Sequence, residues 1–451
     1  MWKSLHLRFR QLTPAQLIVS YYLLAITVSM GLLSLPFAHK ERVEWTFLDA
    51  LFTAVSAVSV TGLSTISVAD TFNTTGVFIL MFVLQFGGVG IMTLGTLFWL
   101  LLGKRIGFRE RRLIMTDQNQ IRLSGLVHLL QQIFYIIILI ELIGALILGL
   151  HFRNYFSTWK EAFLHGLFAS VSATTNAGFD ITGASLIPFA NDYFVQFVTI
   201  ILIILGSIGF PVLIETKDFL MNRHKNGKYH FSLYTKLTTL IYFVLFILGT
   251  VLIYLFEYKA FFADKVWHEA LFYALFQSVT TKSSGLATVD MNQLTEATQL
   301  LLSGLMFIGA SPSSVGGGIR TTTFALNLLF LFHFARGNRH IKIFKREIHE
   351  NDILKSLAVT LLAMILCAIS VIILSITENH SLVAIIFEVT SAFGTTGLSM
   401  GITQDLSTTG KWVIMTLMFI GRVGILSFMF MIGGKEKKVH YHYPKERIII
   451  G

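Results

Sequence analysis

Four similar stretches recur along this chain of 451 residues, and each joins a short apolar segment to a loop that contains glycine. They cover residues 49–64, 162–179, 270–286 and 382–398, and their loop glycines are Gly62, Gly178, Gly285 and Gly397. These glycines are 116, 107 and 112 residues apart, so the period is about a quarter of the chain. Self-similarity at a fixed spacing is a sign of repeated structural units. The sequence therefore predicts four copies of one unit.

The composition is typical of a chain that lies in a lipid bilayer. Apolar residues make up 54% of the sequence and charged residues 13%, and the mean hydropathy is +0.69. A run of about 20 apolar residues can cross a bilayer. We predict eight such helices, over residues 16–38, 76–102, 126–150, 193–220, 232–256, 296–334, 353–377 and 411–433. The single cysteine, Cys367, excludes an intrachain disulfide and a cysteine-based metal site.

A shorter helix precedes each glycine loop, over residues 46–59, 159–173, 266–280 and 380–393. A helix of about 12 residues rises only about 18 Å, or half of a bilayer, so it enters the membrane and stops there. Backbone of this kind is stable at membrane depth only where it is buried in protein or lines water. We therefore predict an all-α membrane protein of four tandem helix–pore-loop–helix repeats around a pseudo-four-fold pore, with eight transmembrane helices and four re-entrant half-helices.

The predicted units have the following limits. Residues 1–15 form a cytoplasmic N-terminus, 16–103 the first pore repeat, 104–221 the second, 222–336 the third with an intramembrane gating loop, 337–434 the fourth, and 435–451 a cytoplasmic C-terminal tail.

The basic residues are concentrated on one side of the predicted membrane, and the net charge is +10. With the N-terminus in the cytoplasm, the cytoplasmic segments hold 25 of the 35 Lys and Arg residues and the outer segments hold seven. This is the positive-inside pattern of membrane proteins. The basic residues lie at helix ends and form no recognisable nucleic-acid motif, so we exclude nucleic acid as a partner. They bind anionic membrane lipids or a cytoplasmic partner, or they only fix the topology.

The repeated loop has the chemistry of a cation site. Backbone carbonyls can replace the water of a dehydrated cation, glycine allows the dihedral angles that aim them inward, and the C-terminal end of each short helix adds partial negative charge. The alternative is an ordinary helix end capped by glycine. The predicted ion-binding residues are Val60, Thr61, Gly62, Asn176, Ala177, Gly178, Ser283, Ser284, Gly285, Thr395, Thr396 and Gly397. Lys282 would repel cations if it pointed inward, so we expect it behind the loop or in the outer vestibule, where a carboxylate could pair with it.

A second functional segment interrupts the long apolar run in the third unit. Proline and three glycines cannot sustain a helix, and a loop at this depth could plug the pore. The predicted gate is Ser311, Pro312, Ser313, Ser314, Val315, Gly316, Gly317, Gly318 and Arg422. An arginine in a membrane helix is costly and usually functional; it would be a barrier to cations, a hydrogen-bond partner of the loop carbonyls, or half of an ion pair with Glu388 or Glu141.

These features together resemble the Trk/Ktr/HKT superfamily of potassium transporters, and the resemblance covers nearly the whole chain. Residues 308–322 are similar to the glycine-rich segment of that family's third unit, and residues 419–424 to the arginine-bearing helix of its fourth. The chain starts almost directly at the first unit and has no nucleotide-binding domain, so it looks most like the bacterial Ktr membrane subunit of the KtrB or KtrD type.

The resemblance implies potassium transport across the bacterial plasma membrane, with both termini cytoplasmic. It implies K⁺ at Gly62, Gly178, Gly285 and Gly397, since glycine instead of serine at the first position goes with potassium in the family. It also implies a homodimer on a cytoplasmic nucleotide-binding ring of the KtrA or KtrC type, and a dependence on Na⁺. Two alternatives stay open: a sodium-conducting or K⁺/Na⁺ co-transporting member, and a polytopic membrane enzyme acting on lipid-linked substrates, which would need paired carboxylates or a histidine cluster.

Overall fold

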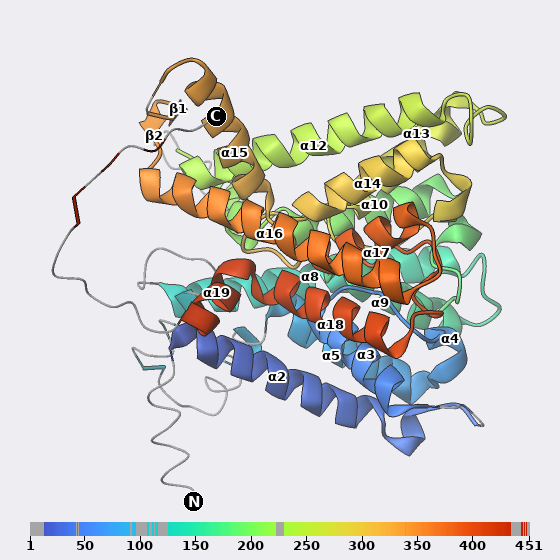
Figure 1. Cartoon of the computed structure of the whole chain (residues 1–451). Helices are drawn as coiled ribbons and strands as arrows, with labels where there is room; N and C mark the ends of the chain where they lie inside the picture. Colours follow the sequence, from blue (N-terminus) through green and yellow to red (C-terminus); the bar gives the residue numbers. More distant parts are fainter. Residues whose placement is uncertain are drawn as a thin grey trace, which may run out of the picture.

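The structure is a computed structural model of the chain (Figure 1). It describes residues 13–41, 43, 45–90, 93–95, 106–107, 111, 113–115, 125–221, 230–338, 340–433, 443–444, 446 and 448. Within these residues the fold is almost entirely helical. The strands β1 (Lys342–Ile343) and β2 (Arg346–Glu347) form a small antiparallel hairpin in which Lys342 pairs with Glu347. The predicted all-helical class is therefore confirmed.

The helices fall into four groups with the same order of parts: a long helix, a short helix that ends at a glycine loop, and a further helix or pair of helices. The first group is α2 (Pro14–Leu33), α3 (Phe47–Ser59) and α5 (Thr74–Val89), and the second is α8 (Leu126–Phe152), α9 (Trp159–Thr174), α10 (Tyr193–Ser207) and α11 (Phe210–Met221). The third is α12 (Leu233–Glu257), α13 (Trp267–Thr280), α14 (Glu296–Ile308) and α15 (Thr321–Ala335), and the fourth is α16 (Glu350–Thr377), α17 (Leu382–Gly394), α18 (Thr408–Val423) and α19 (Ile425–Gly433). Short turns of helix lie between them at η1 (Pro36–Ala38), α4 (Val68–Thr71), η2 (Ile187–Phe189) and η3 (Met291–Gln293).

The long helices α2, α8, α12 and α16 are the membrane-crossing candidates. In the described part of the chain, these four are long and apolar enough to cross a bilayer, and a fifth is added if the bent pair α10–α11 counts as one span. Their outward faces carry exposed apolar side chains such as Leu142, Ile247 and Ile365, which suits contact with lipid. The helices α15 and α19 and the hairpin lie at one end of the molecule, and α4 lies at the other (Figure 1).

The last segment of each group is broken, which corrects part of the prediction. A single crossing helix over residues 193–220 is wrong, because α10 and α11 meet at an angle of 104°. The run at 411–433 is divided into α18 and α19. The run at 296–334 is interrupted as predicted, with α14 before the break and α15 after it. Of the run at 76–102, α5 ends at Val89, and most of residues 91–102 lie outside the described residues. Hydropathy could not reveal the breaks in the runs at 193–220 and 411–433, because the residues on both sides of each break are apolar.

The groups pack in a cycle. Each long helix packs on the short helix of its own group, and the helix after each loop packs on the short helix of the next group. These second contacts pair α5 with α9, α10 with α13, α14 with α17, and α18 with α3. Because the fourth group contacts the first in the same way as the others contact their successors, the four short helices surround a common centre.

The end of each long helix is hydrogen-bonded to the start of the helix that follows the loop, and the third and fourth groups both use a glutamate for this contact. Glu257, at the end of α12, accepts hydrogen bonds from the backbone N–H and hydroxyl of Thr295 (2.9 and 2.7 Å), the N-cap of α14. Glu378, just after α16, accepts the same pair from Ser407 (3.0 and 2.5 Å), the N-cap of α18. N-caps of this kind stabilise a helix by about 1 kcal/mol.

In the first group the corresponding contact is made by an asparagine, and in the second it is made by an aspartate and a histidine. Asn73 caps α5 and donates to the carbonyls of Phe37 and His39 (2.8 and 3.0 Å), which follow α2. Asp192 caps α10 and lies 2.5 Å from His151 of α8. Burial alone would raise the pKa of Asp192, but hydrogen bonds from His151, from Tyr155 and from backbone N–H hold that pKa below its usual value.

Candidate functional site

The four loop glycines lie next to one another in a closed ring. A β-carbon added to Gly62 would lie 2.8 Å from the Cα atom of Gly178, and one added to Gly178 would lie 3.3 Å from the Cα atoms of both Gly285 and Gly62. One added to Gly285 would lie 2.9 Å from the Cα atom of Gly397, and one added to Gly397 would lie 3.1 Å from that of Gly62. The order of contact is therefore the order of the sequence, and it returns to its start.

The carbonyl oxygen before each glycine faces a neighbouring loop of the ring. The pairs, carbonyl first, are Ala177 and Gly62, Ser284 and Gly178, Thr396 and Gly285, and Thr61 and Gly397. In the first two pairs the oxygen would lie 2.6 and 2.8 Å from an added β-carbon. A side chain at any of the four glycines would collide with backbone, so the ring requires the smallest residue at each position.

The backbone of the four loops has one common conformation. The four glycines have φ angles of 93°, 69°, 71° and 95° in chain order. The residue two places earlier also has positive φ in every loop, at Val60 (57°), Asn176 (50°), Ser283 (103°) and Thr395 (47°), and the residue between them does not. In a plain strand, successive peptide units alternate sides, whereas this change of sign turns successive carbonyls to the same side. Each loop can therefore present a row of carbonyl ligands to a cation.

A hydroxyl in the last turns of each short helix holds the loop that follows. Ser56 Oγ accepts a hydrogen bond from the N–H of Gly62 (3.1 Å), and Ser391 Oγ accepts one from the N–H of Gly397 (3.0 Å). The other two loops are held at a carbonyl instead. Ser172 Oγ donates to Phe179 O and Thr280 Oγ1 donates to Leu286 O, both at 2.6 Å. The first and fourth loops thus share one fastening, and the second and third share another.

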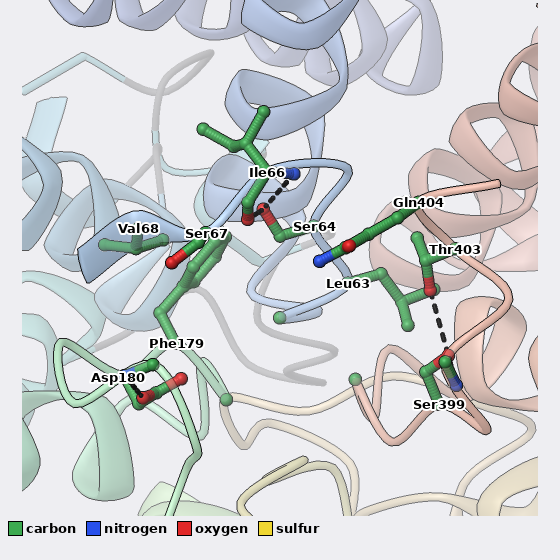
Figure 2. Close-up of a pocket in the computed structure, with 15 residues that line it drawn as sticks. Leu63, Ser64, Ile66, Ser67, Val68, Phe179, Asp180, Ser399, Thr403 and Gln404 are labelled. Atoms are coloured by element: carbon green, nitrogen blue, oxygen red, sulfur yellow. Dashed lines mark hydrogen bonds between the residues drawn. The ribbon is translucent and has the colours of Figure 1, made fainter. Parts of the chain in front are cut away.

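A cavity of about 310 Å³ opens above three members of the ring, and we call it the mouth cavity (Figure 2). Its lining includes Gly62, Gly178 and Gly397 but not Gly285, which is buried. The rest of the lining is mostly polar, with the hydroxyls of Ser64, Ser67, Ser399 and Thr403, the amide of Gln404 and the carboxylate of Asp180. Asp180 and Ser399 lie on opposite sides of the cavity in Figure 2. A space lined by hydroxyls and one carboxylate favours a cation.

Asp180 is fixed in place by its own loop. Its Oδ2 atom accepts hydrogen bonds from the backbone N–H groups of Thr182, Gly183 and Ser185 (3.1, 2.7 and 3.1 Å) and from the Thr182 hydroxyl (2.7 Å). No sequence pattern pointed to Asp180, because it stands two places beyond Gly178 and outside the repeated pattern.

Lys282 lies in neither the cavity lining nor an ion pair. Its side chain is fully buried (0% exposed), and its Nζ atom has no hydrogen-bond partner within the described part of the chain. The expected pairing with a carboxylate is therefore wrong for the described residues, and so is a position in the vestibule. Ser283, the next residue, donates instead to the carbonyl of Thr395 (2.7 Å) and joins the third loop to the fourth.

The predicted gating loop lies directly against the ring, on the side away from the mouth cavity. A β-carbon added to Gly316 would lie 2.5 Å from Ser283 Oγ, and one added to Gly317 would lie 2.6 Å from Thr395 Oγ1. The backbone of the loop is bonded to the second group at the end of α10. Ser311 N–H donates to Ser207 O (3.1 Å), and Phe210 N–H donates to Ser313 O (2.8 Å). The loop is therefore held against the third and fourth loops of the ring.

The sequence suggested that Arg422 could bond to carbonyls of the gating loop. In the structure Arg320, at the end of this loop, makes these hydrogen bonds. Its guanidinium donates to the carbonyls of Ser311 (3.4 Å) and Gly316, and so closes the loop on itself. Its φ of 81° is unusual for a residue with a side chain. The predicted gate did not include Arg320, although its place two residues after Gly318, the last glycine of the loop, was a readable signal.

Arg422 is 8% exposed, and its guanidinium donates to the carbonyl of Gly87 in α5. Within the described residues it makes no ion pair with Glu388, which accepts from the hydroxyls of Ser399 (2.8 Å) and Thr403, or with Glu141, which accepts from Gln85. Both predicted ion pairs are therefore wrong. Arg422 joins the fourth group to the first, at the end of α5 that lies behind the first loop.

The breaks after the loops share a pattern that the sequence analysis missed. The helices end at or just before Gly90, Gly209, Gly309 and Gly424, whose φ angles are 93°, 106°, 71° and 89°. Three residues earlier stand Gly87, Gly206, Met306 and Gly421. A β-carbon at Gly87 would lie 2.7 Å from Val58 O, and those at Gly206 and Gly421 would collide with Thr174 O and Phe393 O. Two glycines three residues apart therefore predict, in three of the four groups, a close contact with the backbone of a short helix and a break in the helix after it.

Comparisons with known proteins identify the family. Residues 6–435 match the family model described as "TrkH: Cation transport protein", and the chain belongs to this family. It is thus a membrane transport protein with several apolar helices and not an enzyme, which excludes the alternative of an enzyme for lipid-linked substrates and agrees with the resemblance described above.

Individual relatives cover almost the whole chain. It is 61% identical over 440 residues to the Ktr system potassium uptake protein D of Bacillus subtilis, covering 98% of each chain. It is 35% identical over 452 residues to the Ktr system potassium uptake protein B of the same organism (99% of this chain and 98% of the relative). It is 34% identical over 449 residues to the potassium/sodium uptake protein NtpJ of Enterococcus hirae (98% of each). The crystal structure of the potassium transporter TrkH from Vibrio parahaemolyticus has the same fold, with a TM-score of 0.71 at 20% identity over 91% of this chain and 84% of that one.

Proposed function

We propose that this chain is the ion-translocating membrane subunit of a bacterial K⁺ uptake system. The observation that carries the proposal is the closed ring of four glycines, each with a neighbouring carbonyl against it. Carbonyls held rigidly in a ring can replace the hydration shell of K⁺. The names of the relatives support K⁺ as the ion, since the 61% identical protein is a potassium uptake protein. The ligands would be the carbonyls of residues 60–62, 176–178, 283–285 and 395–397.

We also propose that the four helix groups are four repeats around one pore, with eight membrane crossings and four re-entrant helices. The cyclic packing of α5, α10, α14 and α18 on successive short helices supports this arrangement. The end with α15, α19 and the hairpin would face the cytoplasm with both termini. The hairpin at that end (Figure 1) contains Lys342 and Arg346, as the positive-inside rule requires.

In this proposal an ion enters the mouth cavity, loses water at the ring and meets the loop of residues 311–318 below it. The contacts of Gly316 with Ser283 and of Gly317 with Thr395 support a closed conformation, in which the loop would block the path below the ring. Conduction requires the loop to move aside. Arg320 holds the loop in its closed shape and Arg422 holds the neighbouring helix end, so both belong to the gate.

The partners in the proposal follow from the relatives. Two relatives are components of a Ktr system, so we propose a homodimer that docks on a cytoplasmic nucleotide-binding ring of the KtrA or KtrC type through the basic end of the molecule. Dependence on Na⁺ is part of the proposal, because another relative is a potassium/sodium uptake protein.

Substitution of a ring glycine tests the proposal. Gly62→Ser would place a side chain against Ala177 O and should relax selectivity for K⁺ over Na⁺ and lower the rate of K⁺ uptake. The measurement is ⁸⁶Rb⁺ and ²²Na⁺ flux into proteoliposomes that contain the purified chain, with and without the cytoplasmic partner. Gly337→Ala is the matched control, because Gly337 also has positive φ (73°) but has no atom within 4 Å of an added β-carbon. Unchanged selectivity in Gly62→Ser would refute the filter.

A second candidate is a protein that conducts Na⁺ or co-transports it with K⁺, and it is favoured by the name of the relative from Enterococcus hirae. The same flux assay separates the two functions. Na⁺ flux that needs no K⁺ supports sodium conduction, and Na⁺ flux that appears only with K⁺ on the same side supports co-transport.

A further inference from the structure

A buried glutamate and a glutamine join the first helix group to the second. Glu141 lies in the middle of α8 and is 4% exposed, and its Oε2 atom accepts a hydrogen bond from Gln85 Nε2 of α5 at 2.6 Å. The backbone carbonyl of Glu141 accepts a further bond from Ser170 Oγ of α9 (2.8 Å), which fixes α8 at this level. None of the features described above accounts for a carboxyl group at this depth.

Two oxygen atoms of the pair have no donor. Glu141 Oε1 and Gln85 Oε1 are both buried, and neither has a hydrogen-bond partner within the described residues. If Glu141 were ionised, the pair would hold two unsatisfied acceptors and an uncompensated charge in an apolar interior, which is strongly unfavourable. One proton on Glu141 supplies the missing donor and removes the charge. A carboxylic acid and a primary amide can then bond in both directions, with the acid O–H donating to the amide oxygen.

We propose that Glu141 is a proton-binding site that is occupied in this conformation, where the neutral acid and Gln85 form a two-way hydrogen-bonded pair. The ligand of the site is a proton, and the pair fastens α5 to α8. Gln85 stands two residues before Gly87, whose carbonyl accepts the hydrogen bond from Arg422. Loss of the proton would therefore weaken the contact between α5 and α8 close to the carbonyl that Arg422 binds. This would couple pH to the gate.

Charged groups do not offer another explanation for the neutral state. The helices packed on α8 include α5, α9, α10 and α11. Their charged and titratable residues, with those of α8 itself, are Lys160, Glu161, His165, Tyr193, Glu215, Lys217, Asp218, His128, Tyr135 and His151. Within the described residues none of them bonds to the Glu141 carboxyl, whose hydrogen-bond partner is Gln85. The effect of substituting Glu141 or Gln85 on pH dependence can therefore be assigned to this pair and not to another titrating group.

Infrared spectroscopy of the purified protein tests the protonation state directly. Wild type at neutral pH should show a C=O stretching band of a protonated carboxylic acid that disappears in Glu141→Gln. Glu257→Gln is the control, because Glu257 is also fully buried but receives three hydrogen bonds, from Phe261 and Thr295, to both of its oxygens. This variant should keep the band. If the wild-type and Glu141→Gln spectra are the same in this region, the proposal is overturned.

The dependence of stability on pH gives a second readout that does not involve transport. A native state that keeps a proton which the unfolded chain releases must lose stability as the pH rises. In Glu141→Gln two amides can form the same two-way pair without a titrating group. The melting temperature of wild type should therefore fall by several degrees more than that of Glu141→Gln between neutral and alkaline pH, and parallel curves would overturn the proposal. Glu141→Asp, which is too short to reach Gln85, should be less stable than both at neutral pH.

The link to the gate is tested by flux and rests on the proposed function. K⁺ flux in wild-type proteoliposomes should change severalfold between neutral and alkaline pH, and flux in Glu141→Gln should not. Identical pH profiles in the two proteins would overturn the coupling. Absence of any K⁺ flux in either protein would count against the proposed function, while the infrared and melting measurements would still decide the protonation of Glu141.

Discussion

The two sides of the glycine ring are built in different ways. On the side of the mouth cavity, four loops share one backbone conformation, and each contributes a glycine and a carbonyl in the same relation to its neighbours. On the other side, a single segment of the third group, residues 311–318, lies against the third and fourth loops, and the other three groups have no counterpart of it in the described residues. Selection of an ion needs several equivalent ligands held still, whereas a gate needs one element that can move. In the proposed function, the repeated part of the chain would serve the first need and the exception would serve the second.

The ring itself is not uniform, because the third loop differs from the other three. Gly285 is buried and lies outside the lining of the mouth cavity, while the other three ring glycines border it. The same loop carries the buried Lys282 and the Ser283 side chain that contacts both Thr395 and the gating loop. The third loop is therefore the place where the selecting side and the gating side meet.

The largest effect is expected from the ring. Alanine at Gly62, Gly178, Gly285 or Gly397 should each lower K⁺ flux by about a hundredfold, because a displaced ligand of this kind raises a barrier by about 3 kcal/mol. The measurement is ⁸⁶Rb⁺ flux in proteoliposomes at equal protein content. If the four loops are equivalent ligands, all four substitutions should lower the flux to a similar extent. A mild effect at Gly285 alone would instead make the third loop part of the gate and reduce the ring to three selecting loops.

The second effect concerns the gating loop and has the opposite sign. Deletion of residues 311–318 removes the segment that covers the ring, so K⁺ flux should rise by about tenfold or more, equivalent to a barrier lowered by about 1.4 kcal/mol. The preference for K⁺ over Na⁺ should persist, because the ring glycines are untouched. Flux at the wild-type level, from a protein that remains monodisperse in detergent, would contradict the role of the loop as a gate.

The two arginines of the gate should differ in a measurable way. Arg320→Gln removes the charged donor that holds the loop carbonyls, and a hydrogen bond to a charged group contributes about 1.5–3 kcal/mol. The closed state should lose most of that energy, and flux should rise by about tenfold. Arg422→Gln acts on Gly87 of a neighbouring helix and not on the loop, so its increase in flux should be smaller. A larger increase in Arg422→Gln would mean that Arg422 acts directly on the ion.

Much of this organisation could be predicted from the sequence, and the exceptions have a common cause. The period of the glycines and the composition of the gating loop are local features, so they predicted the four loops and the segment below them. The partners of Arg422 and Glu141 depend on how separate helices approach, and no local pattern contains that information. The breaks at Gly209 and Gly424 were missed because hydropathy records polarity, while a break depends on φ at one residue.

The smallest effect is expected at the mouth cavity, where one charge faces three glycines of the ring. Asp180 is held by four hydrogen bonds to one of its oxygens, and it is the carboxylate in the lining of the cavity (Figure 2). A fixed negative charge raises the local concentration of cations but does not bind the ion at the ring. Asp180→Asn should therefore raise the K⁺ concentration for half-maximal flux by about threefold, since near a protein surface such interactions amount to about 1 kcal/mol, and should leave the maximal flux unchanged. A threefold change corresponds to about 0.6 kcal/mol, within the range of such surface interactions, and it should vanish at high ionic strength because salt screens exposed charges. A fall in maximal flux that salt does not remove would mean that the second loop has moved, and Asp180 would then belong to the ring and not to its approach.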